Sequence, residues 1–256
     1  VTKEYPDLKV WVNDLYEPLY NFWVVLKNNG DELYKELKSQ KCTYPDPVLP
    51  YGPQQKEFSK KYLGMEFSAR ELFLKSKEIV NNHESEDLLR AAAFYVINKC
   101  SFSGLTEVSS FSKQASVSNF SMRGIDRIPS FSKIIRNWTI TNTTYQNVLD
   151  EQSEREAFIY LDPPYDIKDN LYGKKGDMHK VFDHDDFAKD CDECAFHSIV
   201  SYNSDQLVKD RFQDEKWTAA EFDHTYTLRS VGKYMREQKD RKELLLFNYG
   251  TERLAQ

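Results

Sequence analysis

Residues 157–165 read AFIYLDPPY, an apolar run that ends in an acid, two prolines and a tyrosine. The apolar run predicts a buried strand, which places the Asp162 carboxylate at the edge of a sheet. Pro163 and Pro164 restrict the turn, so that one backbone carbonyl points outward. That carboxylate and carbonyl could accept both N–H bonds of an adenine or cytosine amino group. Tyr165 could stack on the base, which contributes about 1–3 kcal/mol.

Such hydrogen bonds are suited to methyl transfer. They favour a pyramidal amino nitrogen whose lone pair can attack an activated methyl group, such as that of S-adenosylmethionine. The alternative is a tight turn after a core strand, because Asp and Pro are common in turns. The position of DPPY directly after a strand favours the functional interpretation.

The region that positions this turn alternates strands with helices. Strands are expected at WTITN (138–142), AFIYLD (157–162) and FHSIVSYN (196–203), with helices near 145–149, 183–195 and 204–212. TYTLRSVG and KELLLFNYG read as two closing antiparallel strands. The alternation predicts an α/β fold with a mostly parallel, Rossmann-like sheet that binds ligands at the carboxyl ends of its strands. Four polar residues follow strands directly: Asp14, Asn142, Asp162 and Asn203.

The N-terminal part is richer in helices. KVWVN (9–13) predicts a strand, and the helix after it has Pro18 in its first turn and Gly30 past its end. Further helices are expected at DELYKELKSQ, QQKEFSKKYLG, SARELFLKSKEIVNN and SEDLLRAAAFYVINK. Residues 101–124 have no helical period, which predicts an exposed loop or hairpin. We therefore expect a catalytic domain of residues 1–30 and 138–256, with an inserted, mostly helical target-recognition lobe at 31–137.

The charges are distributed unevenly. The net charge is −6, but residues 99–136 and 229–242 are rich in Lys and Arg, whereas acids crowd between 150 and 223. Two basic zones could follow a phosphate backbone. Ordinary solvated surface is the alternative, and the charge pattern alone favours it.

Neither the cysteines nor the apolar segments indicate a special environment. Four cysteines do not make a disulfide scaffold in a chain of 256 residues. Cys191 and Cys194 form a CxxC without a second ligand pair, which is more typical of one helix face shared with Phe187 than of zinc. No apolar stretch is long enough to span a bilayer. We expect a soluble, intracellular protein of a bacterial, phage or viral-host cytoplasm, without a metal.

Several segments together resemble one family. IYLDPPY resembles the fourth motif of amino-group DNA methyltransferases, and the order of the other segments is similar to that of the Dam-type adenine-specific family. NKCSFSGL (98–105) resembles the signature before that family's DNA-entering hairpin. The family's later helix start and strand resemble VFDHDDF and VSYNS, and its closing strand is similar to RKELLLFNY. The strand before its ribose-binding acid resembles VWVNDLYEPLYNFW. The similarity runs nearly from end to end.

The resemblance implies a DNA adenine-N6 methyltransferase that transfers a methyl group from S-adenosylmethionine to an adenine flipped out of duplex DNA, leaving S-adenosylhomocysteine. It implies catalytic roles for Asp162, Pro163, Pro164 and Tyr165, and cofactor-binding roles for Asp14, Asn142, Thr143 and Asp162. DNA contacts are implied for Asn98, Lys99, Phe102, Ser103, Gly104, Arg123 and Arg127. Residues 166–180 would form a lid over the flipped nucleotide.

One expected segment has no counterpart. The family carries an FxGxG motif after its central strand, ahead of the strand that KVWVN resembles, and residues 1–8 contain no glycine. The sheet is then expected to lack its middle strand, which leaves two strands with an unpaired edge. Three explanations remain open: a missing start, a second chain that completes the cofactor site, or a remnant that no longer methylates. The alternative function is thus a non-catalytic DNA-binding subunit. Cytosine methylation and RNA are weaker options.

Overall fold

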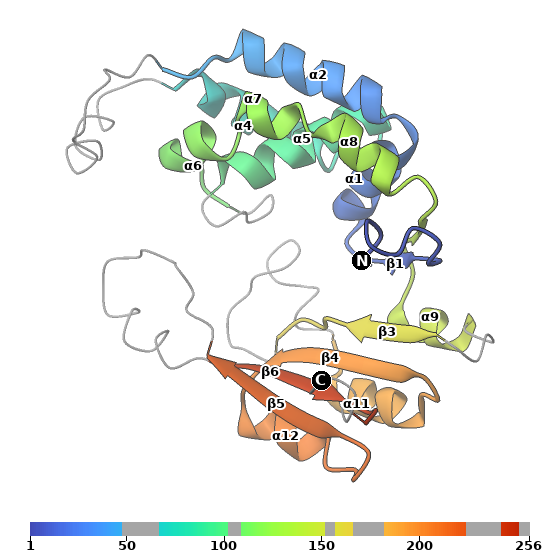
Figure 1. Ribbon diagram of the computed structural model, residues 1–256. Coiled ribbons are helices and arrows are strands. Elements are labelled where there is room, and N and C mark those ends of the chain that lie inside the picture. The colour runs from blue at the N-terminus through green and yellow to red at the C-terminus, as the bar shows by residue number, and fades with distance from the viewer. Residues whose placement is uncertain (48–66, 102–108, 152–156, 166–181, 224–241, 251–256) are drawn as a thin grey trace, which may run out of the picture. The chain divides into compact units, whose positions relative to one another are not determined.

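The computed structural model describes residues 1–47, 67–101, 109–151, 157–165, 182–223 and 242–250 (Figure 1). The chain divides into two units, residues 1–144 and 145–256, each with its own hydrophobic core. Both contain strands and helices, so the predicted mixed α/β class is confirmed. The insertion of a recognition lobe stays a prediction.

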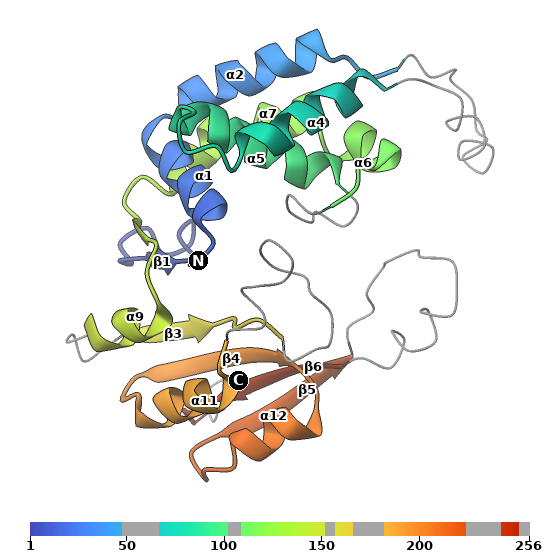
Figure 2. The same cartoon turned by 180° about the vertical axis from the view of Figure 1, so that it is seen from behind.

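Helices dominate the described part of the first unit, with α5 at their centre (Figure 2). Ala91, Ala92 and Ala93 of α5 are almost fully buried, and their small side chains let α1 and α4 pack closely against it. The predicted helix at 54–64 lies outside the described residues. The elements are β1 (Trp11–Asn13), α1 (Glu17–Asn28), α2 (Gly30–Thr43), α4 (Ser68–Ile79), α5 (Asp87–Cys100), α6 (Lys113–Ser118), α7 (Met122–Ile125), α8 (Ile128–Ile134) and β2 (Thr139–Thr141).

The core of this unit crosses the expected domain boundary. Val25 and Leu26 of α1 are buried in the same cluster as Leu33 of α2 and Phe73 of α4. Residues before and after position 30 therefore share one core. The assignment of catalytic and recognition roles to residues 1–30 and 31–137 stays a prediction.

The expected loop or hairpin at 101–124 is wrong for its second half. Ser101 forms an antiparallel bridge with Phe111, but α6 and α7 follow, and residues 102–108 lie outside the described part. Each short helix has a serine N-cap: Ser112 Oγ accepts from Ala115 N, and Ser121 Oγ accepts from Gly124 N. Helices of six and four residues are too short to show a helical period, and Phe120 beside them is fully buried.

A four-stranded sheet forms the second unit, in the order β3-β4-β6-β5. β3 and β4 are parallel, whereas β6 runs antiparallel to both β4 and β5. With the parallel pair β1–β2, half of the four described strand pairs are parallel, fewer than expected. The elements are α9 (Tyr145–Glu151), β3 (Phe158–Leu161), α11 (His184–Glu193), β4 (His197–Asn203), α12 (Gln206–Arg211), β5 (Thr218–Asp223) and β6 (Lys242–Phe247).

The strand that pairs with β6 was not anticipated. The sequence pattern suggested TYTLRSVG, which lies outside the described residues, whereas β5 spans Thr218–Asp223. Its sequence TAAEFD has two alanines and two acids, and so lacks the apolar alternation by which strands are recognised.

Helices α11 and α12 cover one face of this sheet (Figures 1 and 2). Phe187 and Val208 from these helices share a buried cluster with Val200, Leu244 and Leu246 from the strands. Polar side chains lie at the carboxyl ends of β3 and β4, where Asp162 follows β3 and Asn203 ends β4.

The predicted N-cap of α11 is confirmed. Asp183 Oδ1 accepts hydrogen bonds from the backbone N–H groups of Asp186 and Asp185, both at 3.0 Å. These two bonds favour the ionised form and lower the pKa of Asp183.

The CxxC prediction is half right. Cys191 is buried beside Phe187, but Cys194 follows the last residue of α11 and is only partly buried. Burial raises the pKa of the Cys191 thiol, which disfavours the thiolate that binds metals. Within the described residues, no group of three His, Cys, Asp or Glu side chains could hold a metal ion.

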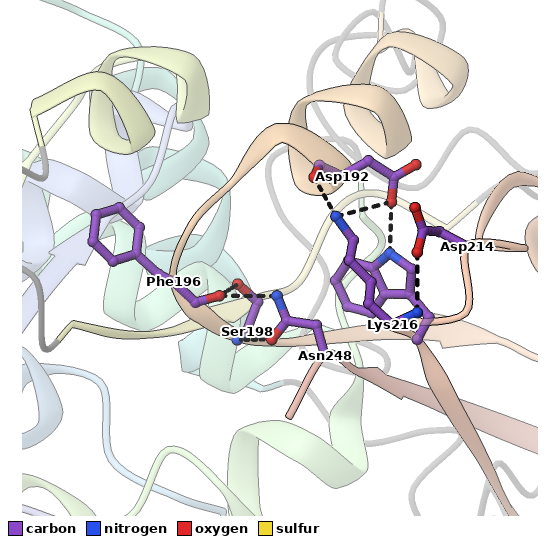
Figure 3. Close-up of polar contacts among 7 residues, drawn as sticks. Asp192, Phe196, Ser198, Asp214, Lys216 and Asn248 are labelled. Carbon is purple, nitrogen blue, oxygen red and sulfur yellow. Dashed lines mark hydrogen bonds and ion pairs between the residues drawn. The ribbon is translucent and has the colours of Figure 1, made fainter. Parts of the chain in front are cut away.

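Polar contacts fix the opposite end of the sheet (Figure 3). Asn248 accepts from Ser198 N at 2.7 Å through Oδ1 and donates to the Phe196 carbonyl at 2.9 Å through Nδ2. Trp217 Nε1 donates to Asp192 Oδ1 at 2.6 Å, which joins the end of α11 to the start of β5. The amino end of β4 is thereby held in place.

Among the described strands, four have a single partner each. Across the described ranges, β1 and β2 pair only with each other, β3 pairs only with β4, and β5 pairs only with β6. The absence of a middle strand stays a prediction. In those same ranges, no helix combines the length and apolar character needed to cross a membrane.

An ion pair between a buried arginine and a partly exposed glutamate provides a test of the first unit's packing. Arg90 of α5 is 5% exposed and its guanidinium bonds to the Glu17 carboxylate of α1. Replacing Glu17 by Ala leaves a buried cation poorly compensated, so the free energy of unfolding should fall by about 3 kcal/mol. Urea denaturation measures this change. Glu32→Ala, which removes an exposed acid from the first turn of α2, should cost no more than about 0.5 kcal/mol. Equal losses would show that the ion pair contributes nothing.

Candidate active site

The structure brings the predicted cofactor-binding residues of the first unit together. Asp14 follows β1, and Asn142 and Thr143 follow the parallel strand β2. Asn142 Nδ2 donates to the Asp14 carbonyl at 2.8 Å, and the Asp14 carboxylate accepts from Tyr16 N at 2.8 Å. The carboxylate is thereby fixed at the start of α1.

Asn13 holds this loop in place, although the sequence did not single it out. Its Oδ1 accepts from Thr141 Oγ1 at 2.8 Å and from Thr143 N at 3.0 Å. Its Nδ2 donates to the Thr143 carbonyl at 2.9 Å. Because these partners lie about 130 positions away in the chain, only the pairing of β1 with β2 reveals them.

The DPPY turn lies in the second unit, at the carboxyl end of β3. The Asp162 side chain is exposed, whereas Pro163 behind it is buried. Asp162 Oδ1 accepts a hydrogen bond of 2.7 Å from Ser201 Oγ of β4. The rigid turn thus presents a carboxylate at the surface with one oxygen already bound.

The tyrosine of the turn is also held by the sheet. Tyr165 is partly buried, and its hydroxyl donates to Glu243 Oε2 of β6 at 2.8 Å. Its ring centre lies 6.4 Å from that of Tyr202 on β4. Tyr202 in turn contacts His184 Nδ1 through its hydroxyl at 2.9 Å. The aromatic ring is therefore anchored at its hydroxyl end and packed on one side.

Sequence patterns missed four of these neighbours: His184, Ser201, Tyr202 and Glu243. VSYNS carried a signal for Ser201 and Tyr202, because a strand parallel to β3 places the residues near its end beside the turn. Glu243 became visible only through the pairing of β6 with β4, which sets it opposite Asn203.

An unsatisfied acceptor lies at the end of β4. Asn203 Oδ1 is buried and has no hydrogen-bond partner within the described ranges. A buried carbonyl oxygen of this kind is costly unless a ligand or water donates to it. Together with the Asp162 carboxylate, it makes this end of the sheet an acceptor-rich site for a ligand with N–H or O–H groups.

The predicted DNA-binding residues are only partly described. Arg123 and Arg127 are exposed around α7, and the Arg127 guanidinium lies 4.9 Å from the centre of the Phe131 ring. Asn98 and Lys99 are partly buried at the end of α5. Phe102, Ser103 and Gly104 lie outside the described residues, as does the expected lid at 166–180.

Known proteins resemble this chain along most of its length. A family model described as D12 class N6 adenine-specific DNA methyltransferase matches residues 1–227. The Type II methyltransferase M.MjaIII of Methanocaldococcus jannaschii is 27% identical over 168 residues, which cover 64% of this chain and 52% of that protein. The chain thus spans about half the length of this curated relative. The family expected from the DPPY segment is confirmed, and the chain belongs to the D12 class N6 adenine-specific DNA methyltransferase family.

Proposed function

We propose that this chain transfers a methyl group from S-adenosylmethionine to N6 of an adenine flipped out of duplex DNA. The observation that carries the proposal is the DPPY turn of a chain that belongs to this family. Its exposed carboxylate is held at one oxygen, and its aromatic ring is anchored beside it.

The acceptor groups of the chain fit the proposed methyl donor. Bound S-adenosylmethionine supplies a methyl group on a positively charged sulfur, which becomes the neutral sulfur of S-adenosylhomocysteine after transfer. The Asp14 carboxylate, which accepts from Tyr16 N, is the group that would accept from ribose hydroxyls. Asn142 and Thr143 would lie by the adenine of the donor.

Asp162 and the turn backbone would act on the target amine. The Asp162 carboxylate and the Pro163 carbonyl accept its two N–H bonds, which directs the nitrogen lone pair toward the methyl carbon. As the new N–C bond forms, the nitrogen becomes positively charged and must lose one proton. Asp162 is placed to accept that proton or to pass it to solvent.

Tyr165 would hold the extruded base. Flipping a nucleotide costs a few kcal/mol of lost stacking and pairing, and an aromatic partner offsets part of this cost. The hydrogen bond to Glu243 keeps the Tyr165 ring in one orientation, so less rotational freedom is lost when the base binds.

A second candidate function follows from the strand edges. β1 and β3 each have a single partner within the described ranges. A chain that needs a further strand, from a longer form of itself or from a partner, would bind DNA without methylating it when alone. The relative M.MjaIII extends well beyond the matched region, which is compatible with this alternative.

Substitution of Asp162 tests the catalytic proposal. Asp162→Ala should lower methyl transfer by about 100-fold or more, because the amine loses its acceptor. DNA affinity should change by less than about twofold, since a single exposed acid is removed. Labelled S-adenosylmethionine, unmethylated duplex DNA and mass spectrometry of the product measure both the rate and the modified base. Asp210→Ala, at an exposed acid of α12, is the matched control.

The outcomes separate the candidates. Methyladenine from the intact chain, but not from the Asp162 variant, supports the proposal. Methylcytosine as the product would show that the target base is cytosine and not adenine. An intact chain that binds DNA but forms no methylated product would favour the non-catalytic DNA-binding subunit.

Substitution of the exposed arginines tests the DNA surface. Arg123→Ala with Arg127→Ala should weaken duplex binding at low salt. The slope of log affinity against log salt should become shallower by about two, because each arginine releases about one counterion. Arg70→Ala, at an exposed arginine of α4, is the control and should leave the slope unchanged. A double variant with an unaltered slope would exclude this patch from the interface.

A further inference from the structure

We propose that Ser201 is a positioning residue for Asp162, an inference that rests on the proposed methyl transfer. Ser201 lies on β4 and is 5% exposed. The register of the parallel pair, with Leu161 opposite Val200, sets Ser201 directly beside Asp162. Ser201 Oγ donates to Asp162 Oδ1 at 2.7 Å, a short bond of the kind made to an ionised carboxylate.

A second hydroxyl fixes the direction of this bond. Tyr160 lies two residues before Asp162, and its hydroxyl donates to Ser201 Oγ at 3.1 Å. A serine hydroxyl has one proton, so when Ser201 accepts from Tyr160 its own proton is directed to Asp162. Tyr160, Ser201 and Asp162 thus form a chain of hydrogen bonds that ends on one carboxylate oxygen.

The consequence concerns the other oxygen. Asp162 is exposed, and an exposed carboxylate rotates among several conformers unless something holds it. Binding of Oδ1 to Ser201 selects one conformer. It also reserves Oδ2, to which no described side chain donates, for the N–H bond of the target amine. Ser201 therefore prepares the acceptor before the base enters the site.

Tyr165 is held independently of the hydrogen bonds that join Tyr160, Ser201 and Asp162. Its hydroxyl bonds to Glu243 on β6, so removal of the Ser201 hydroxyl leaves the stacking ring in place. Loss of Ser201 should therefore reduce the rate of methyl transfer without weakening DNA binding. A serine that only satisfies its own burial would affect neither quantity.

Single-turnover kinetics test this role. Ser201→Ala should slow methyl transfer about 10- to 100-fold, because a hydrogen bond to a charged group is lost, with DNA affinity unchanged within about twofold. Ser201→Thr restores the hydroxyl and should recover the rate to within about threefold of the wild-type chain. Tyr160→Phe removes the donor to Ser201 and should have a smaller effect, about three- to tenfold.

Ser204→Ala is the matched control. Ser204 follows the end of β4 and also donates to a carboxylate, that of Glu221 at 2.6 Å, but Glu221 lies on β5, at the opposite edge of the sheet from β3. It should keep the full rate. Thermal unfolding of each variant shows whether a lost rate is caused by a lost fold. If Ser201→Ala fails to fold, Tyr160→Phe gives the decisive comparison, because the Tyr160 side chain is 60% exposed and its substitution disturbs the fold little.

The results distinguish this inference from the proposed function. If Asp162→Ala abolishes transfer while Ser201→Ala and Tyr160→Phe keep the full rate, the positioning role is wrong and the function stands. If Asp162→Ala keeps the rate, the proposed site itself fails. If the wild-type chain transfers no methyl group, crystal structures decide: an Asp162 carboxylate that changes conformer in Ser201→Ala supports the inference, and one that stays in place overturns it.

Discussion

Parallel hydrogen bonding between β3 and β4 sets Leu161 opposite Val200, and this register determines which side chains surround the DPPY turn. A shift by one residue would turn every side chain of β4 to the other face of the sheet. Ser201 would then point into the helices, and Val200 would take its place beside Asp162. The buried cluster of Val200, Tyr202 and Leu244 against α11 and α12 makes that shift costly. The hydrophobic face of the sheet thus specifies the polar site at its edge.

In the first unit, strand pairing also positions the candidate residues, but side-chain hydrogen bonds support it in place of a hydrophobic face. β1 and β2 are only three residues long, and the Asn13 side chain supplements their backbone pairing with three hydrogen bonds. These bonds fix the loop after β2 next to Asp14. In both units the residues that the sequence singled out are presented at strand ends, and neighbouring side chains, which were not recognised in advance, hold them there.

The sequence predicted the strands and helices that have strong periodicity and clear boundaries. WTITN, AFIYLD and FHSIVSYN became β2, β3 and β4, and Asp183 caps α11 as expected. α6 and α7 were missed because they are too short for a period, and β5 because TAAEFD lacks apolar alternation. Asp162 and Tyr165 could be selected from the motif alone. Ser201 and Glu243 could not, because a hydroxyl or acid on a strand acquires its meaning from the register of pairing.

The edge of β3 has a consequence for handling the protein. Phe158 and Tyr160 are 57% and 60% exposed, and β3 has one partner strand in the described ranges. An edge with open backbone N–H and C=O groups and aromatic side chains is a template on which another copy can add a strand. Crowding copies together, as during concentration or overexpression, therefore favours edge-to-edge aggregation through β3.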